Sequence, residues 1–166
     1  MSVLYMMIGV PGSGKSTIAN EIGRVLGIPV VSSDNVRKEL TGSEEDFSKD
    51  NEVWRYEIPG RLRNALRKGD VVFDATNLRV RDRNKTRRSI GMEHECYAVY
   101  VNVPLETCIE RQANRERKVP PERIEEMYKG MVPPTTNEGF ENIYIVKDAK
   151  ECLELLSKNA EYEKDR

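Results

Sequence analysis

Cysteine and histidine are scarce in this sequence. Its three cysteines, Cys96, Cys108 and Cys152, are odd in number and far apart, no CxxC pair is present, and there is a single histidine. A disulfide framework needs paired cysteines and a zinc site needs a Cys/His cluster, so the sequence indicates neither. We expect three reduced, buried thiols.

Long apolar runs are also missing. No stretch approaches the roughly 20 residues of a membrane-spanning helix. Residues 1–8 lead straight into a glycine-rich loop, without the basic start and the small-residue cleavage site of a signal peptide. We therefore expect a cytoplasmic protein without a membrane partner.

The balance of charge argues against a protein that is basic overall. Lys and Arg number 27 against 28 Asp and Glu, for a formal net charge of -1, so any contact with nucleic acid depends on a local patch. The 166 residues are 38% hydrophobic, which is enough for one core, but the chain is short for two catalytic domains. We expect a single domain over 1–160 and a charged, frayed tail over 161–166.

Strands and helices alternate along the chain. Short apolar runs predict strands, and apolar residues at helical spacing follow them. This order predicts an α/β fold with a parallel sheet of about five strands, helices on both faces, and ligands at the carboxyl ends of the strands. The predicted strands are 3–8, 28–32, 71–73, 96–103 and 144–146, and the predicted helices lie within 15–26, 33–40, 52–68, 81–90, 105–109, 121–128 and 149–157.

A phosphate-binding motif lies between the first predicted strand and the first predicted helix. Residues 9–16, Gly-Val-Pro-Gly-Ser-Gly-Lys-Ser, match G-x-x-x-x-G-K-[ST] in the context where that motif works. Glycines let backbone N–H groups turn toward phosphate oxygens, and the helix N-terminus favours the same anion. Lys15 is expected to bridge the β- and γ-phosphates of ATP and Ser16 to hold Mg²⁺. The predicted ATP-binding set is Gly9, Pro11, Gly12, Ser13, Gly14, Lys15, Ser16 and Thr17, and the alternative is a glycine-rich turn that binds nothing.

The remaining motifs favour a small kinase over other P-loop proteins. An Asn-Lys-x-Asp motif and an Asp-x-x-Gly after a buried strand are both missing, which disfavours a GTPase, and a motor ATPase would be larger. A kinase needs a base for the acceptor hydroxyl and cations for the transferred phosphoryl group. Asp34 follows the second strand, on the same sheet edge as the loop, and is the candidate base. Its alternative role is to cap the next helix, which we expect to begin from Ser33 or Asp34.

Several segments in this order resemble the 5′-polynucleotide kinases of the phage type, within the small P-loop kinases. The resemblance runs from about residue 3 to residue 131. The loop alone is shared by many kinases, whereas the later segments are more specific. These marks are Gly-Val-Pro-Gly-Ser-Gly-Lys-Ser-Thr at 9–17, Ser-Asp-Asn-Val-Arg at 33–37, Ala-Thr-Asn-Leu at 75–78, arginines at 111 and 115, Val-Pro at 119–120 and Met-Tyr-Lys-Gly-Met at 127–131.

The resemblance implies roles for one carboxylate and three arginines. It makes Asp34 the general base and Arg37 the ligand of the acceptor's 3′-phosphate. Residues three apart share one helix face, so this pairing is physically reasonable. The resemblance also makes Arg115 the lid arginine that neutralises the β- and γ-phosphates, with Arg111 near the adenine or the lid. For either of these two arginines the alternative is a solvated helix face.

Two further residues fall where this family lines the mouth of its acceptor tunnel. They are Thr76 and Val119, and the basic segment 114–121 corresponds to a lid. One departure is Ala75, because some relatives carry an aspartate directly before Thr-Asn. Asp74, one place earlier, either holds Mg²⁺ through water or only ends a strand.

The predicted function is transfer of the γ-phosphate of ATP to the 5′-hydroxyl end of DNA or RNA. Two alternatives stay open: a kinase for a small hydroxylated metabolite or an aminoacyl-RNA hydroxyl, and a regulatory module that binds ATP without transferring phosphate. A basic segment could track the acceptor's phosphates, or could be a solvated helix. Its six cations are Arg79, Arg81, Arg83, Lys85, Arg87 and Arg88.

Overall fold

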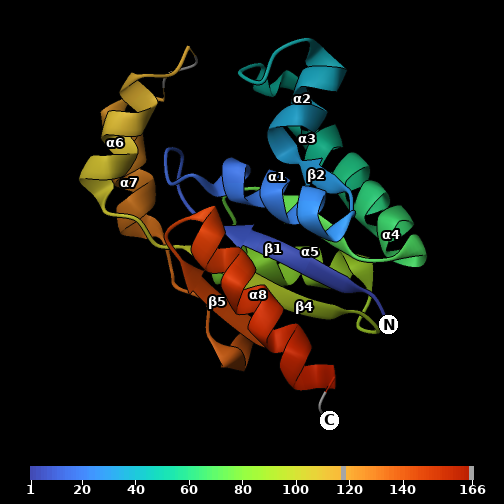
Figure 1. Cartoon of the computed structure of the whole chain (residues 1–166). Helices are drawn as coiled ribbons and strands as arrows, with labels where there is room; N and C mark the ends of the chain where they lie inside the picture. Colours follow the sequence, from blue (N-terminus) through green and yellow to red (C-terminus); the bar gives the residue numbers. More distant parts are fainter. Residues whose placement is uncertain (117–118, 165–166) are drawn as a thin grey trace.

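The chain forms one five-stranded parallel sheet with helices on both faces (Figure 1). The computed structural model describes residues 1–116 and 119–164. The strands are β1 (Val3–Ile8), β2 (Val30–Ser32), β3 (Val71–Asp74), β4 (Glu95–Val101) and β5 (Asn142–Val146), in the order β2-β3-β1-β4-β5. All four strand pairings are parallel, which confirms the predicted α/β fold.

The helices are also close to the predicted positions. A continuous helical stretch passes through Pro59, and the π-helical turn directly before it accommodates a residue that cannot donate a backbone hydrogen bond. The helices are α1 (Lys15–Leu26), α2 (Ser33–Thr41), α3 (Asp50–Glu52), α4 (Ile58–Lys68), α5 (Val80–Ile90), α6 (Leu105–Ala113), α7 (Pro121–Gly130) and α8 (Ala149–Lys164), with a π turn at Val53–Glu57 and 3-10 turns at Phe47–Lys49 and Thr136–Glu138.

Several boundaries differ from the prediction, among them the start of β5 at Asn142, two residues earlier than expected, and the end of α6 at Ala113. β2 begins at Val30, two residues later than expected, and β4 ends at Val101, two residues earlier. α8 continues to Lys164, so residues 161–164, for which a frayed tail was predicted, lie in this helix. Residues 165–166 of that predicted tail are outside the described part of the chain.

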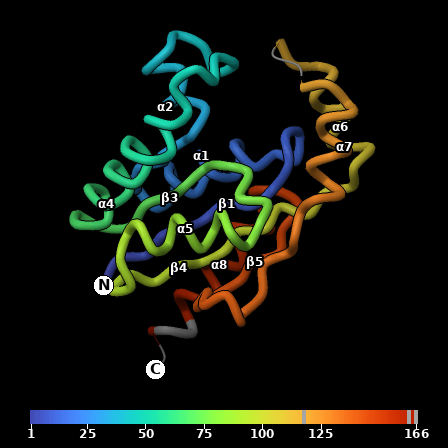
Figure 2. Tube along the Cα trace, turned by 180° about the vertical axis from the view of Figure 1, so that it is seen from behind, coloured from blue at the N-terminus to red at the C-terminus, as the bar shows by residue number. Residues whose placement is uncertain are grey.

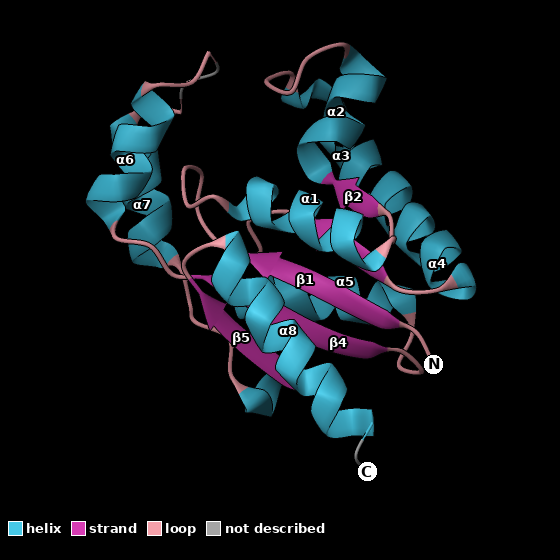
Figure 3. Ribbon diagram, viewed as in Figure 1, coloured by secondary structure: helices cyan, strands magenta, loops and turns pink. Residues whose placement is uncertain are grey.

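The two faces of the sheet carry two separate cores. β1 shows the pattern clearly, because Leu4, Met6 and Ile8 join one core while Tyr5 and Met7 join the other. A strand buried on both faces reads as a continuous apolar run, as this one does. Figures 1 and 3 show α1 and α8 on one face, and Figure 2, seen from behind, shows α5 crossing the other.

The strand order brings the carboxyl ends of β1, β2 and β3 to one edge. Ser32 at the end of β2 is level with Asp74 at the end of β3, and Met6 of β1 is level with Phe73. The glycine loop and α2 leave the sheet at this edge. Figures 1 and 2 show α2 on one side above it and α6 with α7 on the other.

The three cysteines are buried and free, as expected. Burial raises the pKa of the Cys96 and Cys152 thiols to about 12, so both stay protonated near neutral pH. Among the described residues, no helix has the length and apolar character needed to cross a bilayer.

One predicted surface cation is in fact part of the interior. Arg83 is fully buried, and its Nε and Nη2 donate to the Glu138 carboxylate at 2.8 and 2.9 Å. Its Nη1 donates to the carbonyls of Asn77 at 3.0 Å and Val132 at 2.9 Å. The expectation that residues 79–88 form one exposed basic segment is therefore wrong at Arg83, which joins α5 to the segments after β3 and after α7.

Removing the partner of Arg83 should destabilise the fold. Burial works against ionisation of Glu138, but the hydrogen bonds from Arg83 and from the Thr135 N–H, together with the charges of Arg83 and Arg87, outweigh it and hold the pKa of this carboxyl below its ordinary 4.5. We expect Glu138→Gln to lower the free energy of unfolding by about 3–5 kcal/mol in urea at pH 7, because a buried guanidinium loses its counter-ion. The carboxyl contributes this stability above its unfolded pKa, so the wild type should lose it as the pH falls below about 4.5.

The exposed pair Arg123–Glu126 supplies the matched control. Glu126→Gln removes the same charge from a carboxylate that is 73% exposed, and should change stability by less than about 0.5 kcal/mol. Equal losses in both variants would contradict a structural role for the buried pair.

Candidate active site

The glycine loop has the backbone shape that phosphate binding needs. Gly12 and Gly14 have φ values of 85° and 92°, a region that favours glycine. A Cβ at Gly12 would overlap the backbone carbonyl of Cys108, so no side chain fits there. The Gly9 N–H donates to the Thr76 carbonyl at 3.1 Å, which ties the loop to the segment after β3.

The start of α1 presents donors suited to an anion. Within the described chain, no side chain caps this helix, whose N-cap is Gly14. The N–H groups of its first turn are thus available to phosphate oxygens. With Lys15 and the Ser16 hydroxyl they form a donor set that fits a nucleotide triphosphate with Mg²⁺, in which Ser16 would hold the ion together with phosphate oxygens.

Lys15 is paired with Asp74. Its Nζ lies 2.9 Å from Asp74 Oδ1, and the two side chains are only 11% and 5% exposed. A buried charge needs such a partner. Neither role considered for Asp74 from sequence included this contact, in which the carboxylate at the end of β3 holds the lysine of the glycine loop.

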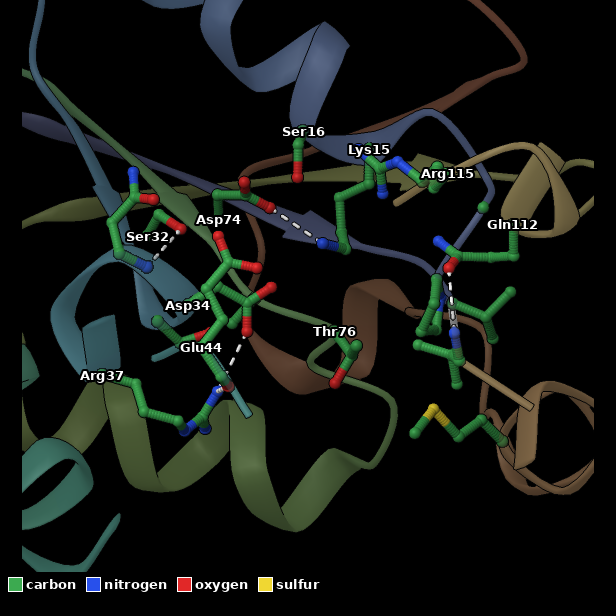
Figure 4. Close-up of a pocket in the computed structure, with 18 of the residues that line it drawn as sticks. Lys15, Ser16, Ser32, Asp34, Arg37, Glu44, Asp74, Thr76, Gln112 and Arg115 are labelled. Carbon is green, nitrogen blue, oxygen red and sulfur yellow. Dashed lines mark hydrogen bonds and ion pairs between the residues drawn. The ribbon is translucent and has the colours of Figure 1, made fainter. Parts of the chain in front are cut away.

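Asp34 is available for chemistry because another residue caps α2. The N-cap is Ser32, whose Oγ accepts from the Asn35 N–H at 3.3 Å, so the capping alternative for Asp34 and the predicted cap at Ser33 or Asp34 are wrong. The Asp34 side chain is 43% exposed and accepts from Arg37 Nη1 at 2.9 Å. Figure 4 shows Asp34 between Asp74 and Arg37, among the residues that line the cleft.

Arg37 is bound by two carboxylates. Its side chain is 6% exposed, and its Nε and Nη2 donate to Asp50 Oδ1 and Oδ2 at 2.7 and 3.0 Å. Its Nη1 donates to Asp34 Oδ1 and to the Glu44 carbonyl. The guanidinium carbon lies 4.4 Å from the centroid of the Phe47 ring. The hydrogen bonds that Arg37 donates to Asp50 outweigh burial and raise the pKa of Arg37. This arrangement lets Arg37 orient Asp34, and an acceptor phosphate would compete with Asp50 for the same donors.

The opposite wall of the cleft comes from α6 and the segment that follows it. Arg111 Nη1 donates to the Ser13 carbonyl at 3.0 Å, against the outside of the glycine loop. Arg115 is exposed, just beyond α6. The buried Gln112 of α6 accepts from the Val119 N–H at 3.3 Å, which ties the predicted lid segment back to α6. The lid residues 117–118 are outside the described part of the chain.

These walls enclose a cleft of about 1010 Å³. That volume is at the upper end of ordinary ligand sites, and leaves room for a nucleotide and an acceptor together. Gly9 and Ser13 are not among the lining residues and act through the backbone of the loop. The predicted site residues that line the cleft are Pro11, Gly12, Gly14, Lys15, Ser16, Thr17, Asp34, Arg37, Thr76, Arg111, Arg115 and Val119.

Several residues at the acceptor end of the cleft were not predicted from the sequence. Asp50 comes from a polar segment predicted as loop, and Glu44 and Phe47 line the cleft from the same segment. Trp54, an apolar residue of the predicted helix 52–68, is 37% exposed and lines the cleft while its ring packs edge-on against Phe73. The aromatic side chain of Phe47 within a polar stretch was the one feature of the sequence that could have indicated a residue of the site.

A protein-family comparison agrees with this geometry. The AAA_33 model, described as an AAA domain, matches residues 4–134. The chain belongs to this AAA domain family. The broader part of the sequence resemblance, to small P-loop kinases, is thereby confirmed, and the reaction class of this AAA domain is ATP-dependent phosphotransfer.

Individual relatives of the AAA domain differ in their acceptors. A shikimate kinase from Clostridium botulinum (strain Okra / Type B1) is 27% identical over 144 residues, covering 76% of this chain and 79% of the relative. An L-seryl-tRNA(Sec) kinase from Methanococcus maripaludis is 26% identical over 164 residues, covering 92% of this chain and 61% of the relative. A chain in the solved Pnkp1/Rnl/Hen1 RNA repair complex shares the fold, with a TM-score of 0.72, 20% identity, and coverage of 89% of this chain and 49% of that one.

The Lys15–Asp74 pair leads to a prediction about ATP binding. Asp74→Asn leaves a largely buried ammonium group without its counter-ion, so we expect the melting temperature without nucleotide to fall by several degrees. Mg²⁺-ATP supplies a new partner for Lys15 and should then raise the melting temperature more in Asp74→Asn than in the wild type. Differential scanning fluorimetry with and without the nucleotide measures both effects.

Two variants complete that test. Asp82→Asn removes an exposed carboxylate on α5 and should behave like the wild type, whereas Lys15→Ala should lose most of the nucleotide-dependent rise. A smaller rise in Asp74→Asn than in the wild type would contradict the pairing role, and would assign Asp74 to the Mg²⁺ site instead.

Proposed function

We propose that this AAA domain transfers the γ-phosphate of ATP to the 5′-hydroxyl end of a polynucleotide, DNA or RNA. The observation that carries the proposal is the position of Asp34, which Arg37 holds at the end of β2, in the same cleft as Lys15 and the glycine loop. A general base must lie within reach of the acceptor hydroxyl and of the phosphate to be transferred.

Each residue then has a defined part in the transfer. The acceptor oxygen attacks the γ-phosphorus while its proton passes to the Asp34 carboxylate, and ADP leaves from the opposite side. Lys15 and Arg115 stabilise the negative charge on the transferred group, and Ser16 helps to hold Mg²⁺. Lys15 and Arg115 both line the cleft.

The acceptor end of the cleft suits a nucleic-acid base. Phe47 is 57% exposed and Trp54 is 37% exposed, and both line the cleft. Stacking of a base on an aromatic side chain is worth about 1–3 kcal/mol and tolerates any sequence. Thr76 and Val119 line the same cleft, at the positions that the resemblance assigns to the tunnel mouth. A chain in a solved RNA repair complex shares the fold, which adds support for a nucleic-acid acceptor.

A different observation favours the second candidate, a kinase for a small hydroxylated metabolite or an aminoacyl-RNA hydroxyl. Asp34 and Asp50 already share the Arg37 guanidinium, and Glu44 and Glu45 line the same end of the cleft. Such an environment favours a neutral or cationic acceptor group over a phosphate. The relative named shikimate kinase is an example of a small-molecule kinase.

A transfer assay separates these functions. We expect label from γ-labelled ATP with Mg²⁺ to reach a 5′-hydroxyl oligonucleotide, and Asp34→Ala to lower kcat by about 10²–10⁴-fold while ATP affinity changes little. Glu52→Gln, which alters an exposed carboxylate outside the cleft, is the control and should keep full activity. Label that reaches only small polyols or seryl-tRNA would select the second candidate, and ATP binding without any transfer would indicate a regulatory module.

A double-mutant cycle tests whether Arg37 and Asp50 orient Asp34. Asp50→Asn breaks the two-pronged contact with Arg37, so we expect kcat to fall about tenfold with ATP affinity unchanged. In an Arg37→Lys background the two-pronged contact with Asp50 is already lost, so Asp50→Asn should lower kcat little further. Fully additive losses in kcat would contradict the idea that Asp50 acts through Arg37.

A further inference from the structure

The cations of helix α5 differ in burial: some face the interior and others are exposed. Arg83 is fully buried, and Arg87 is half-buried, where it donates to the Glu138 carbonyl and lies 4.6 Å from the Phe140 ring. The remaining three, Arg81, Lys85 and Arg88, are exposed. Their spacing of four and then three residues places them along one face of the helix.

Together with Arg79, which is exposed just before α5, these three residues are named here the α5 stripe. Within the described part of the chain, no carboxylate forms a salt bridge with any of the four. Some exposed cations on other helices have such partners, as in Arg24–Glu21, Arg123–Glu126 and Lys129–Glu125, whereas Arg67, Lys68, Lys150 and Lys158 form no salt bridge within the described residues. What distinguishes the stripe is that its unpaired cations follow one another along one helix face.

The charge of this segment stands out against the rest of the chain. Residues 79–88 hold six cations and one aspartate, whereas the chain as a whole has a net charge of -1. The buried Glu138 offsets Arg83, so the exposed cations account for the local field. An unpaired basic strip on a nearly neutral protein is the local patch that contact with a polyanion requires.

The stripe begins close to the cleft. Arg79 follows Thr76, a cleft-lining residue, by three positions, so their Cα atoms are at most about 11 Å apart. From Arg81 to Arg88 the helix rises about 10 Å. Figure 2 shows α5 crossing the face of the sheet that α1 and α8 leave uncovered, starting from the segment that follows β3. A chain that leaves the cleft beside Thr76 can thus continue along this helix.

We propose that the α5 stripe binds the backbone phosphates of a single-stranded polynucleotide whose 5′ end lies in the cleft. This inference rests on the proposed function, since it extends the acceptor site of the same reaction. The contacts are to phosphates and not to base edges, so binding along the stripe is independent of sequence. It depends on the length of the strand, because a short acceptor fills the cleft without reaching α5.

Binding without ATP tests the stripe separately from catalysis. Fluorescence anisotropy would compare 3′-labelled, 5′-hydroxyl single strands of about 4 and about 16 nucleotides. The stripe variant is Arg81→Gln with Lys85→Gln and Arg88→Gln. The matched control is Lys147→Gln with Lys150→Gln and Lys158→Gln, which removes three exposed cations in or just before α8, on the opposite face.

The expected result depends on the length of the strand, on the salt concentration and on the position of the substituted cations. The wild type should bind the long strand about tenfold more tightly than the short one, and log K should fall with log salt concentration with a contribution of about 0.7 per phosphate contact. The stripe variant should lose the length advantage and reduce the salt slope by about 2, for three lost contacts. The α8 variant should keep both, and thermal melting should confirm that each variant is folded.

Each other outcome overturns the proposal. Unchanged binding of the long strand by the stripe variant, or equal losses in the α8 variant, would show that position does not matter. Equal competition by poly-glutamate would indicate an acidic protein partner or unspecific attraction. If the strands bind as predicted but no phosphate reaches the oligonucleotide, the proposed function is refuted and the binding role of the stripe is retained. If the stripe variant binds and phosphorylates the long strand as well as the wild type does, the proposed function is retained and the role of the stripe is refuted.

Discussion

Parallel pairing of β1 with β3 is the constraint on which the site depends. It sets the end of β1, where the glycine loop begins, beside the end of β3, where Asp74 lies. Two contacts then span the same strands: the hydrogen bond from the Gly9 N–H to the Thr76 carbonyl and the ion pair of Lys15 with Asp74. β2, paired on the other side of β3, adds Asp34 at the same edge. A site assembled from three separate parts of the chain follows from strand order.

Charge compensation shapes this site as strongly as the backbone does. Lys15 and Arg37 are both largely buried, and each has carboxylate partners. Buried charges without partners are costly, so these contacts keep the cleft stable before substrates bind. Asp34 and Arg115, which the proposed reaction needs to move or to meet a substrate, are the more exposed groups. In the proposed reaction the buried lysine changes partner when ATP binds, whereas the more exposed Asp34 and Arg115 meet the acceptor and the phosphate.

Local patterns predicted the strands, most helices and the glycine loop. The apolar run of β1 and the spacing of glycines before Lys15 need no information from distant residues. Contacts between distant segments were beyond such patterns. Arg83 looked like one of six solvated cations because its partner, Glu138, is 55 positions away. Asp50 lies in a polar stretch without periodicity, so nothing in the sequence connected it to Arg37.

In the proposed reaction, one cleft holds Lys15 on the phosphates of ATP and Asp34 toward the group to be transferred. A crystal structure with Mg²⁺ and a non-hydrolysable ATP analogue would test this arrangement. We expect that Lys15 Nζ leaves Asp74 for the β- and γ-phosphate oxygens, that Ser16 Oγ contacts Mg²⁺, and that Asp34 faces the γ-phosphate with space for a hydroxyl between them. A nucleotide bound outside the glycine loop, with Lys15 still on Asp74, would contradict it.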